Sequence, residues 1–220
     1  MPIWDIIGPV MIGPSSSHTA GAVRLGRMAL LCNSRPIEKV DIYMRGSFAS
    51  TGKGHGTDKA LVAGLLGLTP DDTDVRRSFE LAEERGLDYT FHEENLDGAH
   101  PNSVRFVITN PEGQKEIIGS SVGGGAINVE EMDGFKIGVS GTLPVLIIVN
   151  RDIHGVVGAV TSCLSNHDIN IATMKLNRNA RGGLATMVIE LDSPGSRLAI
   201  EAIERCHPGI VKVIGMEEIN

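Results

Sequence analysis

The chain has 220 residues, of which 41% are hydrophobic and 21% charged, and its formal net charge is −7. This composition is typical of a globular protein, and the length allows two modest domains with buried cores. The acidic net charge argues against a nucleic-acid partner, because binding phosphates requires clustered Lys and Arg, and the sequence contains no such cluster. No apolar run approaches the roughly 18 residues of a membrane span, and the N-terminus does not resemble a signal peptide, so we expect a cytoplasmic protein without a membrane partner.

The three cysteines, Cys32, Cys163 and Cys206, are too few and too scattered for a complete metal or cluster site. Their number is odd, and no two of them stand in a CxxC spacing. We expect free thiols, buried as small hydrophobes in a reducing compartment. The histidines lack a paired spacing such as HxxxH, so we expect no metal ligands on this chain.

The first part of the chain predicts helices followed by strands. Apolar residues at helical spacing predict a helix over 15–31, a second over 57–68 and a more exposed third over 74–86. Alternation and turn residues predict strands over 39–46, 88–94, 103–110, 115–122 and 126–132, with NPEG at 110–113 as a turn between two of them. Helices followed by an antiparallel group of strands predict an α+β first domain, over residues 1–140.

The pattern of predicted strands and helices changes at Leu143. The chain then predicts, in order, a strand, a helix, a strand, a hairpin turn at ARGG, a strand, a helix and a last strand. The order βαββαβ within fewer than 80 residues is that of a ferredoxin-like fold, with helices on one face of an antiparallel sheet. We therefore expect a second domain of this fold over residues 143–220.

The segment MIGPSSSHTAG, residues 11–21, places five consecutive polar side chains at the start of the first predicted helix. The first turn of a helix exposes unpaired N–H groups and a partial positive charge, which attract anions. One serine could simply cap the helix while the others face solvent, but a cap needs only one or two hydroxyls. The surplus favours a substrate-binding segment, made of Ser15, Ser16, Ser17, His18 and Thr19.

The segment GSFASTGKGHGTD, residues 46–58, holds His55 among closely spaced glycines just before the second predicted helix. Gly54 and Gly56 allow tight backbone conformations, so we expect His55 on a tight loop, with Thr57 and Asp58 following it. The spacing is not that of a phosphate-binding P-loop. A lone histidine is more often structural, but one placed in this way is a candidate general acid or base.

Two further stretches carry weaker signals. AHPNS, residues 99–103, offers His100 and Asn102, which could equally be a surface residue and a turn former. SSVGGGAI, residues 120–127, places Gly124 in a glycine run that is either a flexible loop or a backbone cradle for a ligand carboxylate. The gathering of His18, His55 and His100 on polar or glycine-rich segments of one domain favours a site there.

In the second domain, the predicted loop NRDIHGVVG, residues 150–158, joins the first strand to the first helix. Gly155 would let the backbone approach a ligand or a neighbouring subunit. Asn150 and Asp152 are the polar candidates for such a regulatory contact, although Asp152 and His154 could equally be simple turn residues.

Four stretches of the first domain together resemble the β chain of the bacterial iron–sulfur-dependent L-serine dehydratases: DIIGPVMIGPSSSHTAGA, GSFASTGKGHGTDKALVAGLLG, HPNS and SVGGGAI. The residues from about 143 onward resemble an ACT domain. The resemblance implies conversion of L-serine to pyruvate and ammonia with a [4Fe–4S] cluster, whose cysteine ligands lie on a separate α chain. It thus implies an α-chain partner, and self-association through the ACT-like domain.

The resemblance also suggests roles for the candidate residues. We expect His55 to act as the acid/base residue, with Thr57 and Asp58 orienting it, and the segment Ser15 to Thr19, His18 included, to bind the serine carboxylate or face the cluster. His100 and Asn102 would support them. The first domain is also similar to the allosteric substrate-binding domain of some phosphoglycerate dehydrogenases, so the alternative is a non-catalytic module that senses serine. In the ACT-like domain, His154 stands where a proline is common.

Overall fold

The computed structural model describes residues 9–33, 35–94, 100–178 and 180–219. Residues 5–8 of the first family motif and Ala99 of AHPNS therefore lie outside the described residues. The chain divides into two compact units, residues 1–134 and 135–219. Among the described residues, no helix is both long and apolar enough to cross a membrane.

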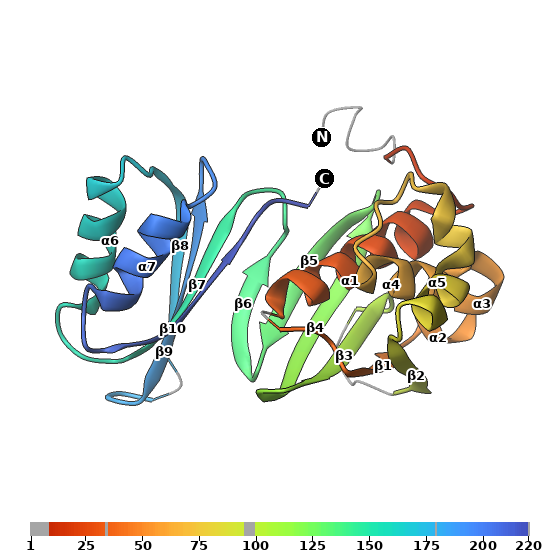
Figure 1. Ribbon diagram of the computed structural model, residues 1–220, viewed down its shortest axis with the longest axis horizontal. Helices are drawn as coiled ribbons and strands as arrows, with labels where there is room; N and C mark the ends of the chain where they lie inside the picture. The colour runs from red at the N-terminus through yellow and green to blue at the C-terminus, as the bar shows by residue number, and fades with distance from the viewer. Residues whose placement is uncertain (1–8, 34, 95–99, 179, 220) are drawn as a thin grey trace. The chain divides into compact units, whose positions relative to one another are not determined.

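The first unit packs helices against one face of a mixed sheet (Figure 1). The sheet follows the order β2-β1-β3-β4-β5-β6. The strands that the first unit contributes are β1 (Lys39–Met44), β2 (Asp88–Glu93), β3 (Ser103–Asn110), β4 (Gly113–Gly123) and β5 (Ala126–Met132). The last strand in this order, β6 (Phe135–Val139), begins just after the end of that unit at residue 134. The helical segments are η2 (Ser16–Ala20), α1 (Gly21–Cys32), α2 (Ser47–Ser50), α3 (Gly52–His55), α4 (Thr57–Leu65), η3 (Thr73–Arg77) and α5 (Ser78–Glu84).

The prediction that the strands of the first domain form an antiparallel group is wrong in one respect. β1 pairs in parallel with β2, with Lys39 opposite Asp88, and antiparallel with β3 on its other side. The chain between β1 and β2 contains α4 and α5, which gives it the length that a parallel crossover needs. β6 was not anticipated either, although Asp133 and Gly134, both with positive φ, form the tight turn before it.

Helix boundaries also differ from the expectation. The helix predicted over 15–31 opens with a π-helical turn, η2, before α1 begins. The third predicted helix begins with the 3₁₀ turn η3 and continues as α5. The glycine-rich segment expected as a loop folds into the one-turn helices α2 and α3. Gly56, with φ of 69°, ends α3 in the left-handed conformation, so this glycine stops a helix and does not loosen a loop.

Helices α1 and α4 cross at two glycines. A Cβ added to Gly26 would collide with the carbonyl oxygen of Leu61, and one added to Gly64 would collide with the carbonyl oxygen of Val23. The two backbones can approach this closely only because both positions lack a side chain. This crossing brings the segment before α1 and the segment before α4 to the same part of the unit.

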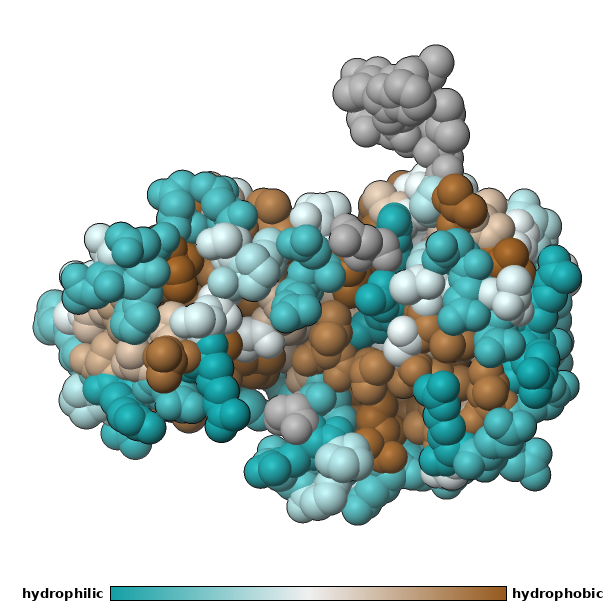
Figure 2. Space-filling model, turned by 45° about the horizontal axis from the view of Figure 1, so that its top comes forward, coloured by the Kyte–Doolittle hydropathy of each residue, from teal (hydrophilic) through white to brown (hydrophobic). Residues whose placement is uncertain are grey.

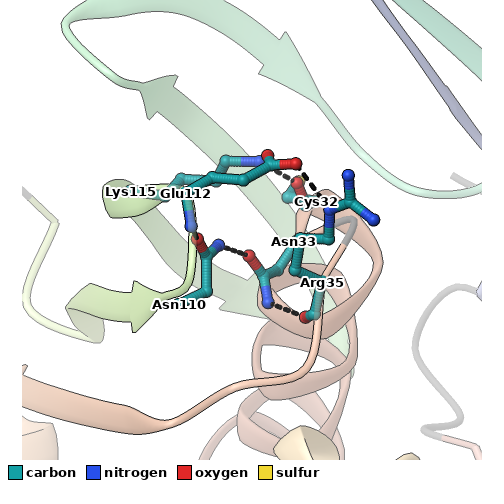
Figure 3. Close-up of polar contacts among 6 residues, drawn as sticks. All are labelled: Cys32, Asn33, Arg35, Asn110, Glu112 and Lys115. Atoms are coloured by element: carbon teal, nitrogen blue, oxygen red, sulfur yellow. Dashed lines mark hydrogen bonds and ion pairs between the residues drawn. The ribbon is translucent and has the colours of Figure 1, made fainter.

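The other end of α1 is held by a buried polar network (Figure 3). Lys115 is 6% exposed, and its ammonium donates to the carbonyl oxygen of Cys32 at 2.5 Å. A cation at this position complements the partial negative charge of the helix C-terminus. The Asn33 amide donates to the carbonyl oxygen of Arg35 and accepts from the Asn110 amide, so the chain leaving α1 is fixed against β3.

The second unit contains the ferredoxin-like βαββαβ arrangement, as predicted. Two helices lie on one face of an antiparallel sheet with the order β10-β7-β9-β8 (Figure 1). The elements are β7 (Val145–Arg151), α6 (Val156–Asn166), β8 (Ile171–Arg178), β9 (Leu184–Leu191), α7 (Arg197–Arg205) and β10 (Ile210–Met216). Its core joins Ile148 and Met187 of the sheet to Val160 and Ile203 of the helices.

Apolar side chains also reach the surface in both units (Figure 2). In the first unit Leu31 is partly exposed. In the second unit Leu176 lies 51% exposed on β8, the edge strand of the sheet, and Leu198 and Val211 are more exposed still. An edge strand with exposed apolar side chains can pair with another chain.

Candidate active site

The segment SSSHTA forms a π-helical turn at the start of α1. Ser15 stands in extended conformation before it, and its hydroxyl oxygen accepts a hydrogen bond from the backbone N–H of His18 at 3.2 Å. The serine cap expected from the sequence is thus present, at the first of the three serines. π-helical turns are rare and occur frequently at functional sites.

The π turn places the imidazole of His18 against that of His55. The two ring centroids are 4.8 Å apart and the ring planes are inclined by 32°. The ring of Phe48, fully buried in α2, contacts His18 edge-on at 5.4 Å. Segments 37 positions apart in the sequence therefore meet as a pair of titratable rings, supported by one aromatic side chain.

The pair changes the proton affinity of one of its members. The pKa of His18 lies below its ordinary value because burial and the neighbouring His55 both disfavour a charged ring, while a hydrogen bond with the backbone of Ser47 opposes them. His18 is therefore held neutral to lower pH than a solvent-exposed histidine, and a neutral ring can accept a proton at one nitrogen.

Thr51 contacts both histidines. Its hydroxyl lies 3.3 Å from Nε2 of His18, and its carbonyl oxygen lies 3.0 Å from Nδ1 of His55. Neither Thr51 nor Ser47 was among the candidate residues expected from the sequence. The signal that could have found them is their spacing, because residues 47, 51 and 55 share one face if the segment is helical.

Asn102 joins the site through Ser47. The Ser47 hydroxyl donates to the side-chain oxygen of Asn102, and the Asn102 amide donates to the carbonyl oxygen of Ser121 at 3.5 Å. The exposed His100 accepts from the backbone N–H of Asn102 at 3.1 Å. Asn102 is thus linked through Ser47 to the segment that precedes His55, whereas His100 is linked to that segment only through Asn102.

The glycine run packs against α1 rather than against the histidines. Gly123, Gly124 and Gly125 all have positive φ in the turn between β4 and β5, and Arg24 of α1 donates to the carbonyl oxygen of Gly125 at 2.8 Å. In the described residues, no contact joins Gly124 to either His18 or His55.

A cavity of about 530 Å³ opens beside His55. This volume is in the range that holds a small organic ligand. Its wall includes the side chains of Lys59 and Arg76, two cations that were not among the sequence candidates. Thr19 also lines the cavity, and its buried hydroxyl has no hydrogen-bond partner in the described part of the chain. The cavity wall therefore combines two cationic residues with an imidazole.

The remaining candidates of the first unit lie close by but make local contacts. Asp58 accepts from the backbone N–H of Lys59 at 2.8 Å, whereas Nδ1 of His55 is directed to Thr51. The Thr57 hydroxyl is fully buried and, like that of Thr19, has no partner among the described residues. The half-buried Ser16 and Ser17 belong to the π turn, and no side-chain hydrogen bond of theirs is found within the described ranges.

In the second unit, the candidate loop is well ordered by its own contacts. Asp152 accepts from Arg178 at 3.2 Å and from the backbone N–H of Gly182 at 3.1 Å, and these bonds hold the pKa of Asp152 below its ordinary value, the Gly182 bond most strongly. Gly155, with φ of 87°, begins α6. The buried Asn150 donates to the carbonyl oxygen of Arg151, while its side-chain oxygen has no partner in the described part of the chain.

Paired imidazoles beside a cavity of this size are an arrangement that enzymes acting on small substrates use, and the chain continues into an ACT-like unit. Residues 3–85 match the family model described as serine dehydratase beta chain. The chain is 41% identical over 207 residues to the L-serine dehydratase beta chain of Peptoniphilus asaccharolyticus, covering 92% of this chain and 93% of that one. It is 39% identical over 211 residues to the probable L-serine dehydratase beta chain of Bacillus subtilis, covering 96% of both.

The chain belongs to the family of L-serine dehydratase beta chains, which confirms the resemblance found in the sequence. A more distant similarity extends to the D-3-phosphoglycerate dehydrogenase of Bacillus subtilis, 27% identical over 172 residues. These residues are 78% of this chain but only 33% of the dehydrogenase.

Proposed function

We propose that this chain, together with a separate α chain, converts L-serine to pyruvate and ammonia, and that it contributes the His18–His55 pair to the active site. The observation that supports this function most directly is the pair itself, with ring centroids 4.8 Å apart and His55 on the wall of the cavity. The beta-chain relatives support a two-chain enzyme.

We assign the ligands of the [4Fe–4S] cluster to the α chain, because the residues of this chain do not fit such a group. Among the described residues, no group of three or more His, Cys, Asp or Glu side chains is arranged to hold a metal ion. Cys32 is fully buried, and burial raises the pKa of its thiol to about 12, far from the thiolate that a cluster needs. We therefore derive only the steps that this chain's own side chains can perform.

The reaction requires a base, which we assign to this chain. Loss of the Cα proton and of the β-hydroxyl, as water, converts serine to aminoacrylate, which becomes an imine and is hydrolysed to pyruvate and ammonia. His55 takes the Cα proton in this scheme, since its imidazole lies on the cavity wall. His18, whose pKa is lowered, stays neutral beside it and does not repel the protonated ring that forms.

Binding of the serine carboxylate is assigned to the hydroxyls and cations around the cavity. Thr19 is a cavity residue whose buried hydroxyl has no partner in the described residues, and Lys59 and Arg76 in the cavity wall supply positive charge. The remaining residues of this proposed set are Ser15, Ser16, Ser17, Thr57, His100 and Asn102, together with Gly124 of the turn between β4 and β5. Asp58 lies in the first turn of α4, and its proposed role remains that of orienting His55.

The test is turnover of the α/β complex with His55→Ala, compared with His167→Gln at the exposed end of α6 as a matched histidine change. Acid/base residues typically contribute about 10²–10⁴-fold to a rate. We expect a loss in this range for His55→Ala and none for His167→Gln. A loss smaller than about tenfold would remove His55 from the role.

For the ACT-like unit, we propose regulation and self-association. The exposed apolar side chain of Leu176 on the edge strand β8 supports pairing with a second chain. The buried, unpartnered oxygen of Asn150 supports a ligand contact at the loop that also holds Asp152 and Gly155. Substituting Asn150→Ala should change the dependence of turnover on serine while leaving the maximal rate intact. If this chain instead binds serine alone and no α chain restores activity, the serine-sensing module is the correct function.

A further inference from the structure

Thr51 stands one helical turn after Ser47 and one turn before His55, at the junction of α2 and α3. Its backbone and its side chain contact different histidines, the carbonyl oxygen His55 and the hydroxyl His18. Neutral histidine exists in two forms, with the proton on Nδ1 or on Nε2, and the partners of the ring decide between them. The contacts of Thr51 are sufficient to assign both rings.

The assignment of His55 follows from the carbonyl. Nδ1 of His55 lies 3.0 Å from the carbonyl oxygen of Thr51. A carbonyl oxygen can only accept a hydrogen bond, so Nδ1 must carry the proton. The lone pair of neutral His55 is therefore on Nε2, and no hydrogen bond to Nε2 is found within the described ranges of the chain.

The assignment of His18 follows from the hydroxyl. Thr51 Oγ1 lies 2.8 Å from the carbonyl oxygen of Ser47, to which it must donate its only proton. Toward Nε2 of His18, at 3.3 Å, the same oxygen can then only accept, so Nε2 carries the proton. The bare Nδ1 accepts from the Ser15 hydroxyl at 3.4 Å, whose oxygen in turn accepts from the backbone N–H of His18. Every donor in this chain of contacts has an acceptor.

We propose that Thr51 is a positioning residue that fixes His18 and His55 in opposite tautomers, His18 protonated at Nε2 and His55 at Nδ1. The consequence for catalysis, which rests on the proposed function, is that Nε2 of His55 is the basic nitrogen. The hydroxyl of Thr51 acts on His18 and its carbonyl oxygen acts on His55. A substitution can remove the hydroxyl without removing the carbonyl, so the two contacts can be tested separately.

The first test is a long-range ¹H–¹⁵N spectrum of the full-length ¹⁵N-labelled chain at about pH 8, where histidine with its ordinary pKa of about 6.5 is neutral. Protonated and bare ring nitrogens have well-separated ¹⁵N shifts, and spectra of His18→Gln and His55→Gln assign the two rings among the seven histidines. We expect His18 with Nε2 protonated and His55 with Nδ1 protonated. Either ring in the opposite form would overturn the proposal.

The second test uses Thr51→Val, which removes the hydroxyl at nearly constant volume, and Thr51→Ser, which retains it. In the Val variant, the backbone of Ser47 is the acceptor that remains for His18, so the fraction of His18 protonated at Nε2 should fall below that of the parent chain while His55 keeps the proton on Nδ1. In the Ser variant both rings should match the parent protein. A single unchanged His18 tautomer in Thr51→Val would show that Thr51 does not set it. If the Val variant does not fold, the spectra of the parent chain and of Thr51→Ser still decide the assignment.

Turnover of the α/β complex gives an independent measurement. We expect Thr51→Val to lower kcat by about tenfold or more with KM changed less than about threefold, because a misoriented ring affects the reaction more than binding. Thr51→Ser should recover most of this loss. Active His55→Ala would refute the base role but leave the tautomers untouched, whereas wrong tautomers would refute this inference even if His55→Ala is inactive.

Discussion

Gly26 of α1 and Gly64 of α4 lie face to face, so close that a Cβ on either would come within 3 Å of the other's Cα. The packing of these two helices positions both histidine-bearing segments, because η2 precedes α1 and α3 precedes α4. The histidine pair at the candidate site therefore depends on two residues that have no functional group.

Replacing Gly64 by Ala should destabilise the chain and disturb the site together. Since the added methyl meets backbone atoms, which cannot rotate away, we expect a loss of about 1–3 kcal/mol in the free energy of unfolding. Denaturant unfolding measures it. Gly158→Ala, on the exposed part of α6 with open space around it, is the control and should be neutral or slightly stabilising. Equal behaviour of the two variants would contradict the close helix crossing.

Substitutions at Gly54 and Gly56 can measure the cost of backbone strain apart from the cost of steric crowding. A Cβ at either position would meet nothing within 4 Å, but only Gly56 has positive φ. We expect Gly56→Ala to lose about 1 kcal/mol of stability, because alanine is strained in the left-handed conformation, and Gly54→Ala to lose none. Thermal unfolding of both variants is the measurement, and similar losses would argue against a helix stop at Gly56.

Removing the buried ammonium of Lys115 should loosen the end of α1. Lys115→Met keeps the length of the side chain but leaves the carbonyl oxygen of Cys32 without this donor, which costs about 1–3 kcal/mol. Denaturant unfolding should show the loss. The exposed Lys136, changed to Met, is the matched control, with an expected effect within about 0.5 kcal/mol.

The lowered pKa of His18 predicts a stability that falls in acid. Because the folded chain binds a proton at His18 less readily than the unfolded chain, whose histidine titrates near about 6.5, the unfolded state is favoured as pH falls below that value. Above it, His18 is neutral in both states and contributes no pH dependence. Unfolding midpoints between about pH 5 and 8 should therefore decline less steeply for His18→Gln than for the parent chain. A parallel decline would show that His18 titrates normally.

Local patterns in the sequence were sufficient for the second unit. Its strands and helices have clear periods and its turns carry glycine, so local patterns are enough to predict the order βαββαβ, which is that of a ferredoxin-like fold. Local patterns did not predict the parallel pairing of β1 with β2, which joins Lys39 to Asp88 across α2, α3, α4, η3 and α5. Pairing over that distance depends on how helices pack, and a local pattern does not contain this information.

The sequence by itself determined which chemical groups are present: the hydroxyls and imidazole of SSSHT, the imidazole of GKGHG and the family to which both motifs belong. Only the tertiary structure decided that His18 faces His55, that Thr51 lies between them and that Lys59 and Arg76 line the cavity. The physical reason is that motifs fix side-chain chemistry residue by residue, whereas distances between motifs follow from long-range contacts, above all the α1–α4 crossing at Gly26 and Gly64.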